Sequence, residues 1–332
     1  MMKPRRVKTQ QEGFVVVVVL CMIIMLAVLL FGFNHKSRAN LRAVDALRRS
    51  KQAFNCARAG LNIAITVVKD SNDIRSEKRF LELLSGEAVF PVGDGNCSII
   101  VTEENGKLNL NLLKDKHGTL NRTRIDQLLR LIDLLNKDCA GQPHIGYGLV
   151  PSIIDWTDSD DKVTCLPFIK HESLGAESGY YGGLDTPYRC KNKPFESIGE
   201  MLLIKGVTPE IFDRLRDYVT VYGDGKVNIN YVPRRVIESL SEKMDPALAR
   251  MIVGRRKIKP FDSVAELRDV PGMTDSIYNA IRKTVTISPK DRYYRVISQG
   301  RADHIGCRID AILRRNVNTK CVELILYKEL QS

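Results

Sequence analysis

The sequence predicts an α+β protein in which a long N-terminal helix packs on an antiparallel β-sheet, with a large helical domain inserted between the strands of that sheet. Three observations predict this: an uncharged apolar run over 14–33, β-like runs on both sides of a helical middle, and a repeat within that middle. The expected parts are a leader (1–13), a membrane helix (14–33), its continuation (34–70), a β-domain (71–113 and 289–332) and an inserted α-domain (114–288). A chain of 332 residues is long enough for two domains.

The apolar run from Phe14 to Phe33 contains no charged residue. At about 1.5 Å per residue, a helix of this length spans the roughly 30 Å hydrocarbon core of a membrane. The run is longer than the apolar part of a cleaved secretory signal, and no small-x-small cleavage site follows it. We therefore expect a membrane helix that stays with the mature protein.

The leader before this helix is hydrophilic, carries four basic residues and ends in Gly13, next to Phe14. This resembles the leader of type IV prepilins. The resemblance implies that a prepilin peptidase at the cytoplasmic face cuts between Gly13 and Phe14 and methylates the new amine. A plain signal anchor with a glycine at its border is the alternative.

The fifth residue counted from Phe14 is Val18, whereas ordinary pilins and pseudopilins carry Glu at this position. A carboxylate inside lipid costs about 2.5 kcal/mol or more, so it must be neutralised. In the family, this Glu is thought to meet the N-terminal amine of the subunit above. Minor pseudopilin K of type II secretion, the subunit that caps the fibre, lacks this Glu. With Val18 at the position, the sequence resembles that subunit.

The segment after the apolar run continues a helical pattern. Its apolar residues recur at spacings of three, four or seven: Leu41, Val44, Leu47, Phe54, Leu61, Ile65 and Val68. We expect one spine helix that packs on the globular head. Basic residues between Lys36 and Lys51 argue against a periplasmic location by the positive-inside rule. Because leader processing needs a cytoplasmic leader, we still expect a single-pass protein of the bacterial inner membrane with a periplasmic C-terminal part.

Short β-like runs flank the helical middle. Cys97–Val101 and Lys107–Leu113 come before it and are joined by EENG, a hairpin signal, and three further runs come after it: Tyr293–Ser298, Cys307–Leu313 and Cys321–Tyr327. Strands on both sides of a helical block predict one antiparallel sheet with an insertion. Minor pseudopilin K is built in this way.

The middle contains a repeat, over 194–221 and 260–287. Each unit predicts a helix, a hairpin at Gly206 or Gly272, and a second helix capped by Thr208 or Thr274. A second echo is GKLNLN from Gly106 and GKVNIN from Gly225.

Helix-hairpin-helix units often bind the DNA backbone. With a net charge of +12, a membrane-anchored DNA-binding or DNA-uptake protein is therefore an alternative. The hairpins read GVT and GMT and lack the second glycine that lets amides approach phosphate. We expect the glycines to be structural and nucleic acid not to be a partner.

Acidic residues gather after Ile154: Asp155, Asp158, Asp160, Asp161 and, further on, Glu177. Oxygen-rich loops of irregular spacing suit Ca²⁺. The alternative is a solvated acidic turn in which Asp155 or Asp158 caps a helix. The stretches DWTDSDD, GAES and PYRCKNKPFESIGEM are similar to the minor pseudopilin K family, in which calcium has been associated with the α-domain. That resemblance implies these five residues as candidate ligands.

Neither cysteines nor histidines suggest another chemistry. There are eight Cys without a CxxC, so zinc is not expected, and in the periplasm some of Cys139, Cys165 and Cys190 could pair. Five scattered His and the absence of GxSxG and HExxH argue against an enzyme.

Together these motifs resemble the minor pseudopilin K family of type II secretion. The resemblance implies a subunit that joins minor pseudopilins I and J at the pseudopilus tip, starts or caps the fibre, and helps to export folded proteins from the periplasm. The implied partners are these pseudopilins, the fibre, the inner membrane and the prepilin peptidase. A type IV pilus minor pilin is the closest alternative.

Overall fold

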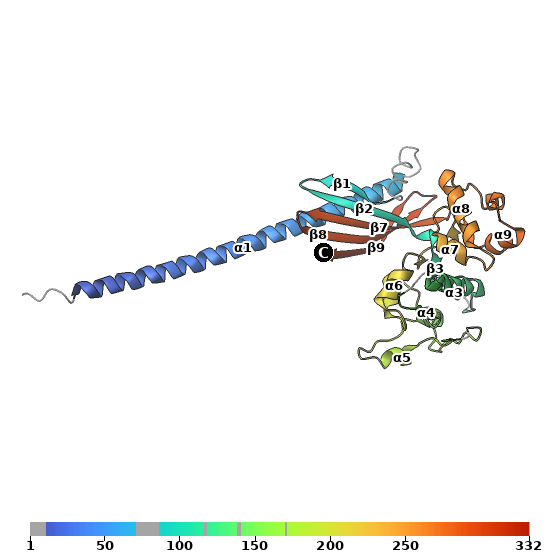
Figure 1. Cartoon of the computed structure of the whole chain (residues 1–332), viewed down its shortest axis with the longest axis horizontal. Helices are drawn as coiled ribbons and strands as arrows, with labels where there is room; N and C mark the ends of the chain where they lie inside the picture. The colour runs from blue at the N-terminus through green and yellow to red at the C-terminus, as the bar shows by residue number, and fades with distance from the viewer. Residues whose placement is uncertain (1–10, 71–85, 116–117, 138–140, 170, 332) are drawn as a thin grey trace, which may run out of the picture.

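The structure is a computed structural model that describes residues 11–70, 86–115, 118–137, 141–169 and 171–331. Most of the expected leader, 1–10, lies outside the described residues. A single helix, α1 (Gln11–Asp70), runs from the N-terminus along a five-stranded sheet, and a helical domain lies beyond the far end of that sheet (Figure 1). The predicted α+β class is confirmed.

The first half of α1 is bare. Among the described residues, α1 is the one helix long and apolar enough to cross a membrane, and its most apolar stretch has no buried residue. Large apolar side chains such as Phe14 and Phe31 are more than two-thirds exposed. Outside a membrane such a surface would be strongly unfavourable.

The sheet has the order β1-β2-β7-β8-β9, and every neighbouring pair is antiparallel. Its strands are β1 (Ala88–Val92), β2 (Gly95–Glu103), β7 (Asp291–Ala302), β8 (Ile305–Asn316) and β9 (Val322–Gln331). The three runs predicted near the C-terminus are confirmed as β7, β8 and β9. The helical domain occupies the chain between β2 and β7, as the insertion predicted.

The second half of α1 packs on this sheet through small residues. The Ser298 hydroxyl donates to the Ala57 carbonyl at 2.8 Å. At Gly300 an added Cβ would lie 2.1 Å from the Ala53 carbonyl oxygen, so helix and strand meet backbone to backbone. Leu61 and Val68 are buried in this core, as predicted.

Three apolar residues of the predicted spine do not pack on the head. Leu41, Val44 and Leu47 are 67%, 64% and 72% exposed, and packing begins only at Ala53. At 3.6 residues per turn, Leu41 and Val44 also lie on the side of α1 opposite Ala57. The regular spacing is real, but these residues belong to the part of α1 that comes before the sheet (Figure 1).

The inserted domain is built from short elements. They are β3 (Leu108–Asn109), α3 (Arg122–Lys137), α4 (Leu149–Thr157), α5 (Ser178–Gly182), α6 (Pro209–Leu215), β4 (Val219–Thr220), β5 (Val227–Asn228), α7 (Arg234–Ser239), α8 (Pro246–Ile258), α9 (Asp275–Ile281) and β6 (Val285–Thr286). The described part of the domain also contains four 3₁₀ helices: η1 (Glu104–Gly106), η2 (Leu110–Leu112), η3 (Ile198–Leu203) and η4 (Val264–Asp269). It has a hydrophobic core separate from that of the sheet.

The hairpin predicted at EENG is wrong. These residues form η1, and the predicted strand over Lys107–Leu113 shrinks to β3, which pairs with β4 in parallel, outside the main sheet. Leu108 and Leu110 belong to the core of the helical domain. The reason is tertiary: Asn228 Nδ2 donates to Glu103 Oε1 at 2.6 Å, and Thr220 Oγ1 donates to Glu104 Oε2 at 2.7 Å. Buried carboxylates need such partners, and these lead the chain into the helical domain.

The sequence repeat is also a structural repeat, and we call 106–221 the first unit and 225–287 the second unit. Leu108 pairs with Val219 in the first, as Val227 pairs with Val285 in the second. The predicted hairpins are present, with φ near +83° at Gly206 and +88° at Gly272, a backbone conformation that favours glycine.

Side-chain hydrogen bonds repeat as well. Asn111 Nδ2 donates to the Phe195 carbonyl at 3.1 Å while its Oδ1 accepts from the Phe195 amide at 2.8 Å. Asn230 and Phe261 exchange the same two bonds at 3.0 and 2.8 Å. The first helix of each repeat is the short 3₁₀ helix η3 or η4. Thr208 and Thr274 both cap the second helix, as predicted.

Candidate metal centre

The acidic residues lie where the two units differ. In the second unit, α8 ends at Ile258 and the chain reaches Phe261 almost at once. In the first unit, the corresponding helix α4 is separated from Phe195 by residues 158–193, which we call the insertion loop. The candidate ligands sit at the end of α4 and in this loop.

Three carboxylates converge there. Asp155 in the last turn of α4, Asp158 just after it and Glu177 just before α5 each place one oxygen within 4.8 Å of the others. Asp155 is fully buried and Glu177 is 4% exposed. The structure therefore brings together three of the five predicted ligands.

These carboxylates have few partners. Asp155 Oδ1 accepts from the Thr164 amide at 2.8 Å, and Asp158 Oδ2 accepts from the Lys114 ammonium. Their other oxygens, and both oxygens of Glu177, are buried and have no hydrogen-bond partner among the described residues. Orphaned buried carboxylate oxygens are costly, so this cluster has the free ligand atoms that a cation needs.

The electrostatics of the cluster lead to the same conclusion. Burial, followed by the charges of Asp155, Asp158 and Asp161, raises the pKa of Glu177 to about 8. Burial also raises the pKa values of Asp155 and Asp158, although Lys114 opposes the shift at Asp158. Among the described residues, only the Lys114 ammonium faces the three carboxylates, so they can all ionise only if more positive charge arrives.

An oxygen donor set fits Ca²⁺, which takes six to eight oxygen ligands in irregular geometry. Asn192, in the same loop, also has an oxygen without a partner. Its Nδ2 donates to the Asp160 carbonyl at 2.8 Å, while its Oδ1 is buried and has no hydrogen-bond partner among the described residues. The ion would be held by the carboxylates of Asp155, Asp158 and Glu177.

Asp160 and Asp161 lie outside the cluster and are exposed. Asp160 Oδ1 accepts from the Lys162 amide at 2.9 Å, and Asp161 Oδ1 accepts from the Ser178 amide at 3.4 Å. They shape the insertion loop. Asp155 lies inside α4 and caps neither end, whereas Asp158 is the C-cap residue of α4 and its amide donates to the Ile154 carbonyl at 3.0 Å.

The insertion loop lies tightly on α4. An added Cβ at Gly175 would be 2.1 Å from Asp155 Oδ2, and the Trp156 ring meets the Tyr181 ring edge-on at 5.4 Å. Tyr188 packs on the same tryptophan at 6.3 Å. An ion at the cluster would therefore join the loop to the helix that it covers.

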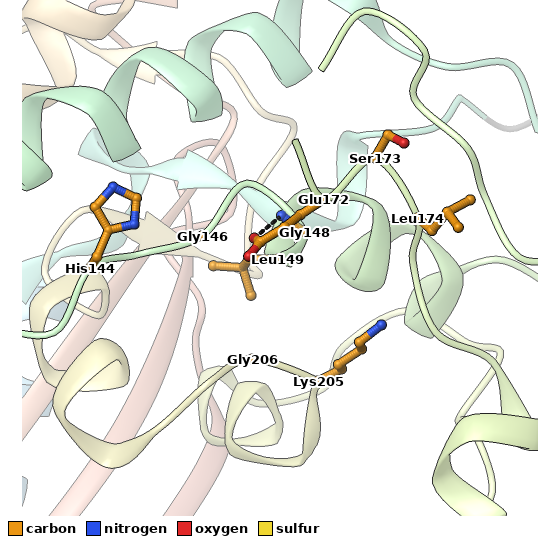
Figure 2. Close-up of a pocket in the computed structure, with 9 residues that line it drawn as sticks. All are labelled: His144, Gly146, Gly148, Leu149, Glu172, Ser173, Leu174, Lys205 and Gly206. Atoms are coloured by element: carbon orange, nitrogen blue, oxygen red, sulfur yellow. Dashed lines mark hydrogen bonds between the residues drawn. The ribbon is translucent and has the colours of Figure 1, made fainter. Parts of the chain in front are cut away.

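A pocket of about 700 Å³ lies next to this contact, between the start of α4 and the first hairpin (Figure 2). Glu172 of the insertion loop reaches over it, and its carboxylate accepts from the Gly148 amide at 3.2 Å. Lys205 and Gly206 of the hairpin line the opposite side. Glu172 has a φ of 56°, an uncommon value for a residue with a side chain.

The remaining predicted residues lie elsewhere. Gly13 and Phe14 are in the first turn of α1, and Val18 lies in the apolar run, half-exposed. Processing at the Gly13–Phe14 bond and the meaning of Val18 stay predictions. Cys165 and Cys190 are both free thiols, so they do not pair with each other, and Cys139 lies outside the described residues.

Comparison with known families assigns the helical domain. Residues 106–224 and 227–288 match two family models, both described as type II secretion system (T2SS), protein K. These ranges coincide with the first and second units. The protein is also 27% identical to type II secretion system protein K of Aeromonas hydrophila over 67% of this chain and 68% of the relative. It is 25% identical to the Pseudomonas aeruginosa protein of that name over 87% and 84%, respectively.

The fold has a solved counterpart. A chain in the crystal structure of the GspK-GspI-GspJ complex from the enterotoxigenic Escherichia coli type 2 secretion system matches with a TM-score of 0.62. The match covers 90% of this chain and all of that one, at 18% identity. With two family models over both units, relatives that match across most of their length and this shared fold, the chain belongs to the type II secretion system protein K family.

Proposed function

We propose that this protein is the minor pseudopilin that forms the tip of a type II secretion pseudopilus with minor pseudopilins I and J. There it starts or caps the fibre that exports folded proteins from the periplasm. The observation that carries the proposal is its family membership, together with a spine helix whose apolar half is bare. The protein is a structural component of a secretion system, and its work is assembly rather than catalysis.

The position of the helical domain supports a place at the tip. The domain lies beyond the end of the sheet that is farthest from the apolar half of α1 (Figure 1). A subunit stacked above this one would meet the helical domain, whereas subunits below would meet α1 and the sheet. Val18 agrees with this, because a subunit with no neighbour above has no amine to pair with a carboxylate at that position.

We also propose that Ca²⁺ binds Asp155, Asp158 and Glu177. The support is the set of buried carboxylate oxygens without partners. When bound, the ion would supply positive charge that lets the three carboxylates ionise together. Asp155 belongs to α4 and Glu177 to the insertion loop, so these residues would hold the loop on the helix through the ion.

The orientation follows from leader processing and is part of the proposal. The leader would be cytoplasmic and the sheet and helical domain periplasmic, with one span in the inner membrane. An alkaline phosphatase fused after Ser332 should be active, since this reporter folds only in the periplasm. An inactive fusion that is present at normal abundance would contradict this orientation.

Deletion of the gene tests the function. We expect secreted enzymes to accumulate, folded, in the periplasm of the deletion strain, and the full-length protein to restore their release. If secretion is normal but surface pili are lost, the protein is a type IV pilus minor pilin instead.

A further inference from the structure

The two units share a helix and a hairpin that face each other. In the first unit, α4 faces the hairpin at Gly206. In the second unit, α8 faces the hairpin at Gly272, where an added Cβ would lie 3.7 Å from Leu248 Cδ1. Leu149 and Ile153 of α4 are buried in the common core, as are Leu248 and Ile252 of α8. The two helices can therefore be aligned residue by residue.

In the first unit, the outer face of α4 is covered by the insertion loop. The four residues on this face of α4 are all buried: Pro151, Ser152, Asp155 and Trp156. The cover consists of a close backbone approach at Gly175, the rings of Tyr181 and Tyr188, and the carboxylates of the loop (Figure 2 shows its Glu172 end).

In the second unit, the same face of α8 is open. The residues aligned with those four are Arg250, Met251, Gly254 and Arg255, and they line a groove of about 560 Å³ against Val270 and Pro271 of the hairpin. Met251 is 42% exposed, and Ile258 at the end of the groove is 88% exposed. No described segment of this chain takes the place of the insertion loop here.

We propose that this groove, which we call the α8 groove, binds an extended segment of a partner polypeptide that carries aromatic and acidic side chains. The first unit supplies the precedent, because its own loop of this chemistry covers the equivalent face. Charge supports the same occupant. Where α4 has Asp155, α8 has Gly254, flanked by Arg250 and Arg255, and Asp269 is the one acidic residue among the described residues that line the groove.

The difference in charge gives the α8 groove its own binding chemistry. In the first unit, Glu177 meets Asp155, and a cation is needed between them. In the second unit, a carboxylate at that place would meet Arg250 directly, a pairing that needs no metal. Arg255 already donates to the Lys259 carbonyl at 2.7 Å and pairs with Glu266 at 3.6 Å. Apolar rings would cover Met251 and Ile258, as Tyr181 and Tyr188 cover Trp156.

The loop itself supplies a probe. A fluorescent peptide with the sequence of residues 172–182, ESLGAESGYYG, should bind the full-length protein in detergent micelles, measured by fluorescence anisotropy. We expect saturable binding with a Kd on the order of micromolar. Met251→Asp and Ile258→Asp should each weaken it at least about tenfold. Leu324→Asp, at an apolar residue of β9 that is 49% exposed, is the matched control and should bind like the wild type.

Two comparisons decide where the peptide binds. Binding in the α8 groove should persist in chelator and should weaken when both Glu residues of the peptide are replaced by Lys. Absence of binding, or binding that Met251→Asp leaves unchanged, overturns the proposal. Binding that instead requires Ca²⁺ and is abolished by Asp155→Asn also overturns it, because the peptide would then be replacing the protein's own loop on α4.

Discussion

The carboxylates of Asp155 and Glu177 lie within 4.8 Å of each other in a buried site, although 21 residues of chain separate the two positions. Burial raises the pKa of both. Such a pair is stable only when a proton or a cation offsets the repulsion. We therefore expect the stability of this site to depend on both pH and cation binding.

Calcium should stabilise the helical domain. At a hundredfold excess over its Kd, an ion that binds only the folded state adds about 2.7 kcal/mol. For a domain of this size, this raises Tm by roughly 5–10 °C. Circular dichroism melts with Ca²⁺ and with chelator would measure the difference, and identical melts would remove the site.

Two variants separate the cluster from the loop around it. Asp155→Asn should abolish the response to Ca²⁺, because it removes a converging ligand. Asp160→Asn should keep it, because Asp160 is exposed and outside the cluster. An equal loss in both variants would place the ion elsewhere.

Without metal, stability should fall as pH rises toward 8. The pKa of Glu177 is raised from 4.5 to about 8, so between these values the folded protein holds a proton that the unfolded chain has released. Folding then takes up a proton, and raising the pH disfavours it until Glu177 is ionised in both states. Denaturation in chelator from pH 5 to 9 should show this slope. Glu177→Gln should reduce it and leave the part due to Glu103, whose pKa is raised by burial to about 7.

Calcium affinity should change with pH in the opposite direction. Binding below pH 8 must displace the Glu177 proton, so the affinity should rise by up to about tenfold per pH unit until it levels off near 8. Calorimetric titrations at pH 6, 7, 8 and 9 would measure it. A flat profile would mean that Glu177 is not a ligand.

The two Asn–Phe contacts should both contribute to stability. Asn111→Ala and Asn230→Ala each leave a buried amide and carbonyl of the Phe backbone unpaired, which costs about 2–4 kcal/mol in total. Asn111→Ala should cost at least as much as Asn230→Ala, because Asn111 Nδ2 also donates to the Val221 carbonyl at 3.0 Å. Asn318→Ala, at an exposed turn, should change stability by less than about 0.5 kcal/mol. Urea unfolding would compare the three, and a smaller loss for Asn111→Ala than for Asn230→Ala would contradict this.

Packing of α1 on the sheet depends on Gly300. Gly300→Ala places a methyl group 2.1 Å from the Ala53 carbonyl, so helix and strand must separate, at a cost of about 1–3 kcal/mol. Gly182→Ala, where nothing lies within 4 Å of the new Cβ, is the control and should be nearly neutral. Thermal melts would measure both, and equal stability would contradict the close approach.

Local sequence patterns predicted the parts that local physics determines. The uncharged run predicted α1, strand alternation predicted β7 to β9, and the threonines predicted both helix caps. The strand and hairpin over 103–113 failed because Glu103 and Glu104 are held by Asn228 and Thr220, partners more than a hundred residues away. No local pattern contains that information.

For the candidate site, the sequence predicted the kind of ligand but not which residues come together. Clustered aspartates indicated oxygen ligands, but not that Asp160 would face solvent or that Glu177 would complete the site. Those outcomes depend on how the insertion loop folds over α4. The open groove on α8 was equally hidden, because it is recognised only when the two units are compared in three dimensions.

Assembly with the other minor pseudopilins is the central claim, and co-purification tests it most directly. The full-length protein, co-expressed with minor pseudopilins I and J of the same system and extracted in detergent, should elute with both as one complex. We expect it to persist at concentrations on the order of micromolar. If this protein elutes alone while I and J elute together, it is not the tip subunit.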